Sequence, residues 1–585
     1  MQGPDSPLAG IAQSLASEAN KSFSFATEFD ADLGQGRLAL PKLVADVAGL
    51  KLRASLTGED MAIDQQQGKL DGKLNVESAE LGPLLRAFGQ GDMARSIKSL
   101  KVETGVQGGL QSLNLSPLTI VVRVAHPELE QSVDLSMTAA SAHADLKAET
   151  ASVKALTVTG LGLHAKADIE AEKIMSKPSY TGSLSVPTFN LRSLLKALNK
   201  PVPQTADPEV LEQLALNARF SGTMTGIKLA ELAVTLDDSH LKGDIDVAEF
   251  KGPNLAFSLK LDGIDADRYL EPPAKGVNQT VVTPDAAVAG AANALPVEKL
   301  RALKVKGSLT VDSLILSGAK MKNVRFSIDA SKGLIKLAPL AALLYDGSYG
   351  GAVHLDARGP QAELALETKL DKVNISPLLQ GTVHNESLSG VMSFDAALKA
   401  EGGDARHVEH TLGGRGRFGI GNGVFRGVDA VAILRAVEQI IECKCAVAVP
   451  KGGQTPFKNL DGTLAIKSGV IRNEDLVMNG EGFTITGKGM LVNLNDNSIK
   501  YDLKLAVTEQ RIKSATDTYK LGGYEVPIAC RGQLDSPSCL PDFGNILGEV
   551  AKAAATKKIE KALGKKLKGA LGGKNGDALK NLLKF

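Results

Sequence analysis

Hydrophobic and polar residues alternate with a period of two along most of the 585-residue chain. Between Phe23 and Leu33, for example, every second residue is apolar apart from Thr27, and most of the positions between them are polar. The same alternation recurs in segments 52–56, 255–261 and 503–507. Because successive side chains of a β-strand point to opposite faces, this pattern predicts strands with one apolar and one polar face.

Glycine-containing pairs separate the strand-like segments, and helical periodicity is short and sparse. Asp-Gly and Asn-Gly tolerate the positive φ of tight turns, so we expect turns where these pairs occur. The pairs are Asp71-Gly72, Asp262-Gly263, Asp346-Gly347 and Asn479-Gly480. The sequence therefore predicts a mainly β fold: an elongated, twisted antiparallel sheet that is curled into an open groove and carries short capping helices.

One local pattern recurs five times: an alternating strand, then Asn or Asp, then a short helical turn that ends in a Leu pair or its equivalent. The copies are residues 74–85, 188–195, 261–270, 370–379 and 427–434. Their spacing is irregular, which excludes a strict solenoid repeat. We expect the same strand-and-cap arrangement at each of the five places.

Changes in composition divide the chain into five parts. Residues 271–297 combine paired prolines with Ala-rich text and lack alternation, so they are expected to form a linker or loop. The predicted parts are an exposed or truncated start (1–20), an N-terminal β-groove region (21–270), this linker (271–297), a C-terminal β-region (298–542) and a basic helical tail (543–585).

The tail is predicted to be an amphipathic helix over residues 543–571, starting near Asp542 and ending at Gly572-Gly573. Residues 551–585 contain ten lysines and only two acidic side chains, whereas the rest of the chain has 57 basic and 64 acidic residues. Either the apolar face of this helix closes an end of the sheet, or its lysines contact anionic lipid or an acidic partner. The candidate contact residues are Lys557, Lys558, Lys561, Lys565, Lys566 and Lys568.

The chain has four cysteines: Cys443, Cys445, Cys530 and Cys539. An even number in a large chain that is otherwise poor in cysteine fits one or two disulfides in an oxidising compartment. Cys530–Cys539 is the favoured pair, as a short bridge across the turn at Pro537, and Cys443–Cys445 would be strained. Zinc is the alternative, although the Cys-Lys-Cys spacing is unusual for it.

Composition argues against nucleic acid as a partner. Aromatic residues make up only 4% of the chain and Trp is absent, whereas binders of single-stranded nucleic acid usually stack bases on aromatic rings. The body of the chain is also acidic. No segment reaches the roughly 18–20 consecutive apolar residues of a membrane helix, and the first 20 residues lack the pattern of a signal peptide.

Catalytic and cofactor motifs are approximated but not met. Residues 482–489 resemble a P-loop but have Gly489 where Ser or Thr must hold magnesium. Residues 414–419 match the dinucleotide pattern without a βαβ frame. His407 and His410 could form a surface pair or, less simply, part of a metal site. We therefore expect no enzymatic activity, no cofactor and no metal.

Two pairs of aspartates are candidates for functional carboxylates. Asp237-Asp238 could act in acid–base chemistry, but their place between two strands favours a hairpin turn. Asp265 and Asp267 are better explained as caps of the short turn that ends at Leu270.

Several segments together resemble the AsmA family. The similarity covers roughly residues 20–545 and depends on the combination, because each segment alone is a weak signal. The segments are Thr205–Leu211, Leu236–Gly243, Asp265–Pro273, Leu303–Arg358, Gly423–Asp429 and Tyr524–Gly532.

The resemblance implies a periplasmic β-rich body in a Gram-negative envelope, with a role in outer-membrane biogenesis. It also implies an inner-membrane anchor through an N-terminal helix, which is absent from this sequence. Larger TamB-like relatives are thought to carry phospholipid in a hydrophobic groove. Phospholipid is therefore the expected partner, and the outer membrane or its proteins are further candidates.

We expect the apolar face of the strands to bind lipid acyl chains. The candidate lining residues are Phe25, Phe29, Leu184, Val186, Phe257, Leu259 and Leu261. These side chains could instead pack in an ordinary closed sandwich core. A rival function is a scaffold that assists outer-membrane protein assembly by pairing its sheet edges with client strands.

Overall fold

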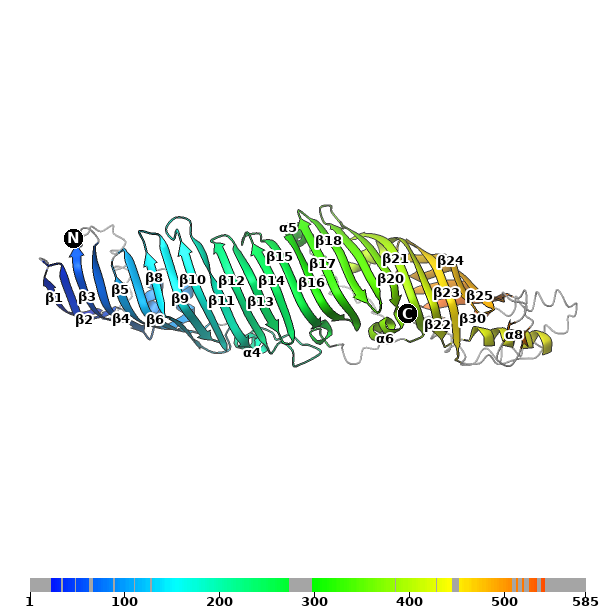
Figure 1. Cartoon of the computed structure of the whole chain (residues 1–585), viewed down its shortest axis with the longest axis horizontal. Coiled ribbons are helices and arrows are strands. Elements are labelled where there is room, and N and C mark those ends of the chain that lie inside the picture. Colours follow the sequence, from blue (N-terminus) through cyan, green and yellow to red (C-terminus); the bar gives the residue numbers. More distant parts are fainter. Residues whose placement is uncertain are drawn as a thin grey trace. The chain divides into compact units, whose positions relative to one another are not determined.

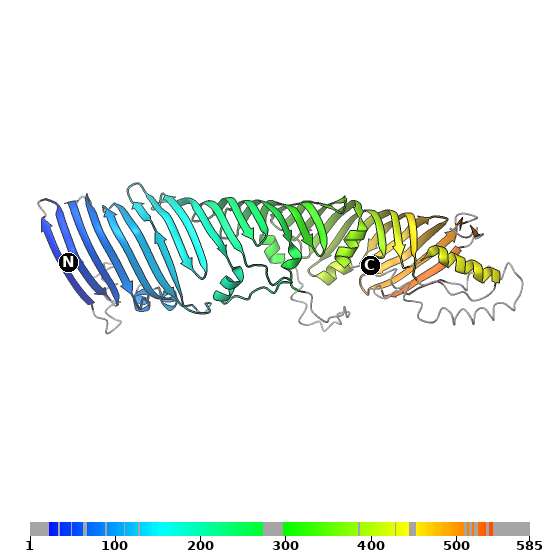
Figure 2. The same ribbon diagram turned by 60° about the horizontal axis from the view of Figure 1, so that its bottom comes forward.

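The described residues of the computed structural model form two compact units. Figures 1 and 2 draw the strands and helices of the chain, coloured by their place in the sequence. The N-terminal unit comprises Met1–Asp262 with Arg268–Ala274, and the C-terminal unit comprises Gly263–Asp267 with Lys275–Phe585. The structure describes residues 23–32, 35–47, 49–62, 67–87, 90–109, 111–126, 129–272, 297–383, 386–427, 429–443, 452–507, 512–513, 518–519, 525–533 and 538–541.

The N-terminal unit is an antiparallel meander in which almost every strand pairs with its neighbours in sequence. Strands β7 and β8 are the exception, since together they fill one place between β6 and β9. The strands are β1 (Phe23–Asp32), β2 (Arg37–Val47), β3 (Leu50–Ala62), β4 (Gln67–Ser78), β5 (Ile97–Gly108), β6 (Ser112–Val124), β7 (Val133–Ala139), β8 (Ser141–Asp145), β9 (Thr150–Gly160), β10 (Leu163–Glu172), β11 (Ser179–Phe189), β12 (Leu214–Thr223), β13 (Ile227–Leu236), β14 (Ser239–Val247) and β15 (Asn254–Asp265).

The C-terminal unit is a second antiparallel meander. Its strands are β16 (Lys304–Leu316), β17 (Ala319–Ser331), β18 (Leu334–Leu344), β19 (Gly347–Asp356), β20 (Ala362–Asn374), β21 (Leu388–Gly402), β22 (Gly413–Arg426), β23 (Gln454–Lys467), β24 (Val470–Gly480), β25 (Phe483–Asn493), β26 (Ser498–Val507), β29 (Glu525–Gln533) and β30 (Ser538–Pro541). A separate two-stranded pair consists of β27 (Ile512–Lys513) and β28 (Thr518–Tyr519).

Short helices follow several strands. They are α2 (Gly82–Ala87), α3 (Gly91–Ser96), α4 (Leu191–Ala197), the 3-10 turn η2 (Ala266–Arg268), α5 (Val297–Ala302), α6 (Ile375–Val383), α7 (Ala405–Thr411) and α8 (Ala430–Cys443). Helices α2, α4, η2, α6 and α8 occupy the five places where the sequence repeats its strand-and-cap pattern. At α4 the side chain of Asn190 accepts a 2.9 Å hydrogen bond from the Ser193 N–H, which satisfies a free donor at the helix start.

The predicted fold class, a mainly β chain of antiparallel strands with short helices, is confirmed. Two of the turn predictions are wrong, because Asp71-Gly72 lies inside β4 and Asp262-Gly263 inside β15. Gly72 is needed for close strand contact: a Cβ there would lie 2.0 Å from the Ser55 carbonyl oxygen. The turn between β18 and β19 consists of Tyr345 and Asp346, so the predicted pair Asp346-Gly347 contributes Asp346 to the turn and Gly347 to the start of β19. Asn479-Gly480 ends β24.

Several predicted features lie outside the described residues. These are the start (1–20), most of the linker (273–296) and the tail with all six candidate lysines (543–585). Among the residues that are described, no helix has the length and apolar character needed to cross a membrane.

β-Bulges keep apolar side chains on one face where the alternation slips by a residue. In β13, Leu229 pairs with Ile245 and Leu232 with Gly243, with Glu231 at φ +50° between them. A carboxylate of the next strand accepts the N–H of the bulged residue. Asp244 Oδ1 accepts from Glu231 at 3.3 Å, and at a second bulge Asp168 Oδ1 accepts from Ala155 at 2.8 Å.

The bulge contact can be tested at Asp168. Asp168→Ala removes the acceptor of the Ala155 N–H, so we expect local opening to become easier by about 1 kcal/mol. Hydrogen exchange measured by mass spectrometry should then be severalfold faster in the peptide 151–160. Asp168→Asn keeps a side-chain oxygen and should exchange like the wild type. Exchange in Asp168→Ala as slow as in the wild type would show that the carboxylate does not hold the bulge.

Candidate functional site

A continuous apolar face runs across the N-terminal unit, because apolar residues lie opposite apolar residues in successive strand pairs. One cross-strand row reads Phe25, Ala45, Leu52, Val76, Val102, Ile120, Met137, Val158 and Ala165. A second row reads Val186, Leu216, Val234, Leu241 and Leu261. Leu156, Ala167, Leu184 and Ala218 join the two. We call this surface the apolar face.

The seven predicted lining residues all fall on this face, but on three separate strands. Phe25 and Phe29 are on β1, Leu184 and Val186 on β11, and the other three on β15. Those on β11 and β15 are half-buried. Phe25 and Phe29 are 57% and 69% exposed, because β1 is the outermost strand and pairs only with β2 among the described residues.

No second layer buries the apolar face among the described residues. Every member of the two rows is half-buried or exposed. The fully buried apolar side chains of this unit are few and mostly small: Ala54, Leu81, Ala94, Val106, Ala139, Val210, Ala218 and Leu232. An accessible apolar surface of this extent is unusual for a monomeric protein and is typical of interaction sites.

The opposite face of the same sheet is polar and carries ion pairs between neighbouring strands. Arg123 Nε lies 2.7 Å from Asp134 Oδ1, and Lys154 Nζ lies 2.5 Å from Glu170 Oε1. These pairs are solvent-exposed and contribute little to stability individually. Their charges keep this face hydrated, so the sheet has one polar, solvent-exposed face and one apolar face.

The apolar face of the C-terminal unit is built by the same rule. One row reads Gly307, Ile328, Leu337, Val353, Leu366, Leu398, Gly414 and Ile466, all half-buried. A second row reads Val373, Met392, Ile420, Leu460, Met478, Ile485, Leu505 and Val526. Most of this second row belongs to a closed hydrophobic core.

Two surface hollows of the C-terminal unit lie mainly over polar-face positions. The larger one, about 1010 Å³, has a floor of small residues such as Gly350 and Ala397 and is flanked by Lys369, Arg415 and Arg417. The other, about 660 Å³, includes His354 and His410. Charged walls of both signs suit water better than an acyl chain, so we do not assign a lipid site to either hollow.

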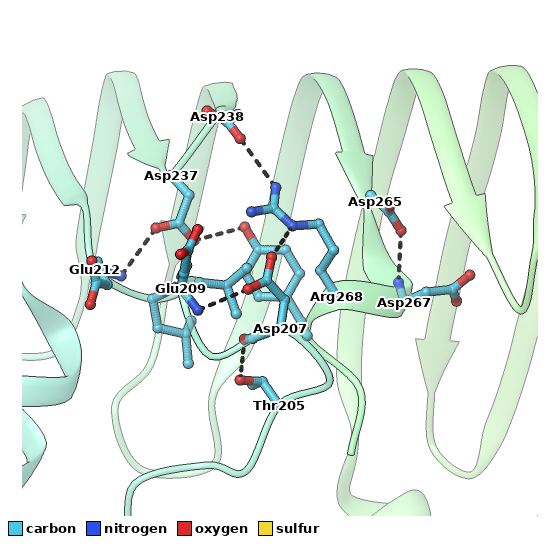
Figure 3. A network of polar contacts seen from close by, with 12 residues as sticks. Thr205, Asp207, Glu209, Glu212, Asp237, Asp238, Asp265, Asp267 and Arg268 are labelled. Atoms are coloured by element: carbon cyan, nitrogen blue, oxygen red, sulfur yellow. Dashed lines mark hydrogen bonds and ion pairs between the residues drawn. The ribbon is translucent and has the colours of Figure 1, made fainter. Parts of the chain in front are cut away.

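A polar network joins three separate segments of the N-terminal unit at the ends of strands β12–β15 (Figure 3). Arg268 lies between two carboxylates: its Nε is 2.8 Å from Asp207 Oδ2 and its Nη1 is 3.1 Å from Asp238 Oδ2. The next residue, Tyr269, donates from its hydroxyl to Asp237 Oδ2 at 2.8 Å. The segment at 268–269 is thereby tied to the loop at 207 and to the turn at 237–238.

Asp237 is the centre of this network. Its carboxylate accepts the backbone N–H groups of Leu211 at 2.8 Å and of Glu212 and Gln213 at 3.1 Å each, as well as the Tyr269 hydroxyl. Burial favours a higher pKa for Asp237, but these hydrogen bonds outweigh burial and hold the pKa below its ordinary value. Burial and the bond to Asp237 raise the pKa of Tyr269 to about 12.

The turn and cap interpretations of the aspartates agree with the structure. Asp237 has a φ of +50° in the hairpin turn between β13 and β14. The last residues of β15, Gly263–Asp265, belong to the C-terminal unit. There Asp265 Oδ1 accepts the Asp267 N–H at 3.2 Å, and Asp267 accepts the N–H groups of Ser317 and Gly318 at the β16–β17 turn. These carboxylates are occupied by backbone donors, which is a structural role.

The sequence alone does not indicate that these residues form one network. Asp207, Asp237 and Arg268 are separated by about 30 residues each. The alternation of apolar and polar residues carries no information on contacts between the loops at the ends of strands. The available signal was the resemblance itself, because the three segments Thr205–Leu211, Leu236–Gly243 and Asp265–Pro273 contribute to it and all three supply residues to the edge loops in Figure 3.

The structure pairs Cys530 with Cys539 in a disulfide between the neighbouring strands β29 and β30, the pairing favoured from the sequence. Both cysteines are buried. Within the described part of the chain, no group of His, Cys, Asp and Glu is arranged to hold a metal ion.

The comparisons with known proteins give one match. Residues 189–476 match the model of the AsmA family. No curated protein and no solved structure matches the chain. The matched region contains the polar network, strands β12–β23 and most of β24.

The network predicts that two adjacent aspartates differ in their importance for stability. Asp237→Asn leaves fewer acceptors for four donors, so we expect the free energy of unfolding to fall by about 1–3 kcal/mol. Asp238→Asn removes the negative charge from an ion-pair partner whose side chain is 88% exposed and should cost less than about 1 kcal/mol. Urea unfolding followed by circular dichroism measures both, and equal losses would contradict the central role of Asp237.

The contribution of Asp237 should also depend on pH. Its pKa is lower in the folded chain than the value of about 3.9 expected when unfolded. The stabilisation is therefore complete at pH values above the unfolded pKa and is lost as the pH falls through the folded pKa. The stability difference between the wild type and Asp237→Asn should stay constant from pH 7 to about pH 5 and shrink below pH 4. A difference that grows on acidification would contradict this assignment.

Proposed function

This chain belongs to the AsmA family, and we propose that it binds phospholipid acyl chains on its apolar face as a non-enzymatic component of Gram-negative envelope biogenesis. Membership of the family is consistent with a role in the envelope or in lipid transport. The finer statement, that acyl chains are bound or conducted between the membranes, is the proposal.

The observation that supports it most strongly is the continuity of the apolar rows. In the N-terminal unit the face crosses 14 strand positions. With neighbouring strands about 4.8 Å apart, this corresponds to roughly 60 Å. A face of that length has room for more than one acyl chain placed end to end.

The chemistry of the face suits a mobile lipid. Each CH2 group removed from water contributes about 0.8 kcal/mol, whatever its position along the face. The rows consist of aliphatic side chains with few polar atoms, so no fixed hydrogen bond would hold a lipid in one place. Polar headgroups could remain in water at the edges of the sheet.

The proposal also covers location and partners. The buried disulfide supports an oxidising compartment, which for an envelope protein is the periplasm. We propose attachment to the inner membrane in the full-length protein and exchange of phospholipid with the outer membrane. The rival function, client binding at sheet edges, has its best candidate in β1, which pairs on one side only among the described strands.

Adjacent substitutions on opposite faces of β15 test the proposal. Leu259 is half-buried on the apolar face, whereas its neighbour Ser258 is exposed on the polar face. A carboxylate placed among acyl chains would have to be desolvated, which costs several kcal/mol. Leu259→Asp should therefore reduce copurified phospholipid at least severalfold, whereas Ser258→Asp should leave it unchanged.

Phospholipid is measured by mass spectrometry after extraction from protein purified in mild detergent. Circular dichroism should show that both variants keep their strand content. If the wild type carries no phospholipid, or if the two variants lose it equally, binding on the apolar face is refuted. Crosslinks from β1 to outer-membrane proteins in lipid-free material would instead favour the scaffold function.

A further inference from the structure

The apolar face of the C-terminal unit is accessible at one side and sealed at the other. On the accessible side, Leu337, Leu366 and Leu398 are half-buried. On the sealed side, Leu505 is 1% and Val526 0% exposed. Both sets lie on the same face of the sheet, so the difference comes from what covers them.

Helices α6 and α8 contribute side chains to the sealed side. Ile375 at the start of α6 and Ile433 and Leu434 of α8 pack in the same buried cluster as Phe483 and Leu505. Leu434 is only 1% exposed. Helix α6 contacts β17 and β21, and α8 contacts β23. Beyond β23, Phe483 and Leu505 are each only 1% exposed, so no accessible surface for an acyl chain remains there.

Hydrogen bonds hold α8 at its N-terminus. The Ala430 N–H donates to the buried Thr455 hydroxyl at 3.0 Å, which connects the helix to β23. The Asp429 side chain accepts the Ala432 N–H at 2.8 Å and caps the helix. The start of α8 is therefore held to the sheet by hydrogen bonds as well as by apolar packing.

Buried polar contacts and the disulfide Cys530–Cys539 stabilise the buried cluster that contains Leu434 and Leu505. Asn473 is 2% exposed, donates to the Thr463 carbonyl at 2.7 Å, and accepts from the hydroxyl of Tyr501. Tyr501 lies opposite Cys530, whose disulfide joins β29 to β30. A satisfied buried polar network favours one packed arrangement, because an unpaired partner would be costly.

We propose that this closed core is a stop that ends the acyl-chain site of the C-terminal unit at about β23. The inference rests on the proposed function and adds a boundary to it. Acyl chains are held on β16–β22, and Leu434, Phe483 and Leu505 block the way further along the face. A lipid bound there dissociates past the ends of the strands, or moves back across the face from β22 towards β16.

Photo-leucine tests this boundary without changing the packing, because it is nearly the same size as leucine. The full chain, with photo-leucine in place of leucine, is loaded with dipalmitoyl phosphatidylethanolamine in mild detergent and irradiated. Lipid adducts are then mapped by mass spectrometry of peptides. We expect adducts at Leu337, Leu366 and Leu398 and at least tenfold fewer at Leu434 and Leu505.

The outcomes separate the boundary from the function. Adducts at Leu434 and Leu505 as frequent as at Leu366 would overturn the stop. Adducts confined to the N-terminal unit, at Leu216 and Leu241, would also overturn it while leaving lipid binding intact. An absence of adducts at leucines of either apolar face would refute the proposed function, and the boundary with it.

Discussion

The structure depends on one constraint: the register of the strands must keep apolar residues opposite apolar residues across the whole of each sheet. Because side chains alternate, a slip of one residue in any strand would turn all its apolar side chains to the wetted face. Leu216, Val234 and Leu241 on three successive strands show how the register holds. The accessible apolar face, and with it the proposed lipid binding, exists only while this register is kept.

Turns, bulges and edge contacts all support that register. At the bulge in β13, the extra residue Glu231 lets Leu229 and Leu232 share a face, and Asp244 accepts its N–H. At the ends of these strands, hydrogen bonds to Asp237 connect the loop 211–213 and Tyr269 to the hairpin turn between β13 and β14. Polar groups thus fix the positions of the strands, while the apolar face itself is free of specific bonds. This arrangement suits a ligand that binds through apolar contact and can still move along the face.

Much of the fold was predictable from sequence, since alternation is a local property. It places Phe257 and Leu259 on one face of one strand, and the structure agrees. Alternation fails where a bulge intervenes, as at Leu229 and Leu232, because the extra residue has no composition signal of its own. It also could not show that Gly72 sits inside a strand, since that depends on the approach of Ser55 from the neighbouring strand.

The polar network and the closed core could not be predicted from the sequence, for a related reason. Asp237 and Tyr269, or Leu434 and Leu505, meet only through the folded arrangement of distant segments, and their residue types are ordinary for turns and cores. Native mass spectrometry of the whole chain, purified in mild detergent, tests lipid binding by the apolar face most directly. The proposed binding predicts masses with one or more phospholipids per chain, lost on washing with a detergent that competes for the face. A lipid-free mass after purification in the mildest detergent would contradict it.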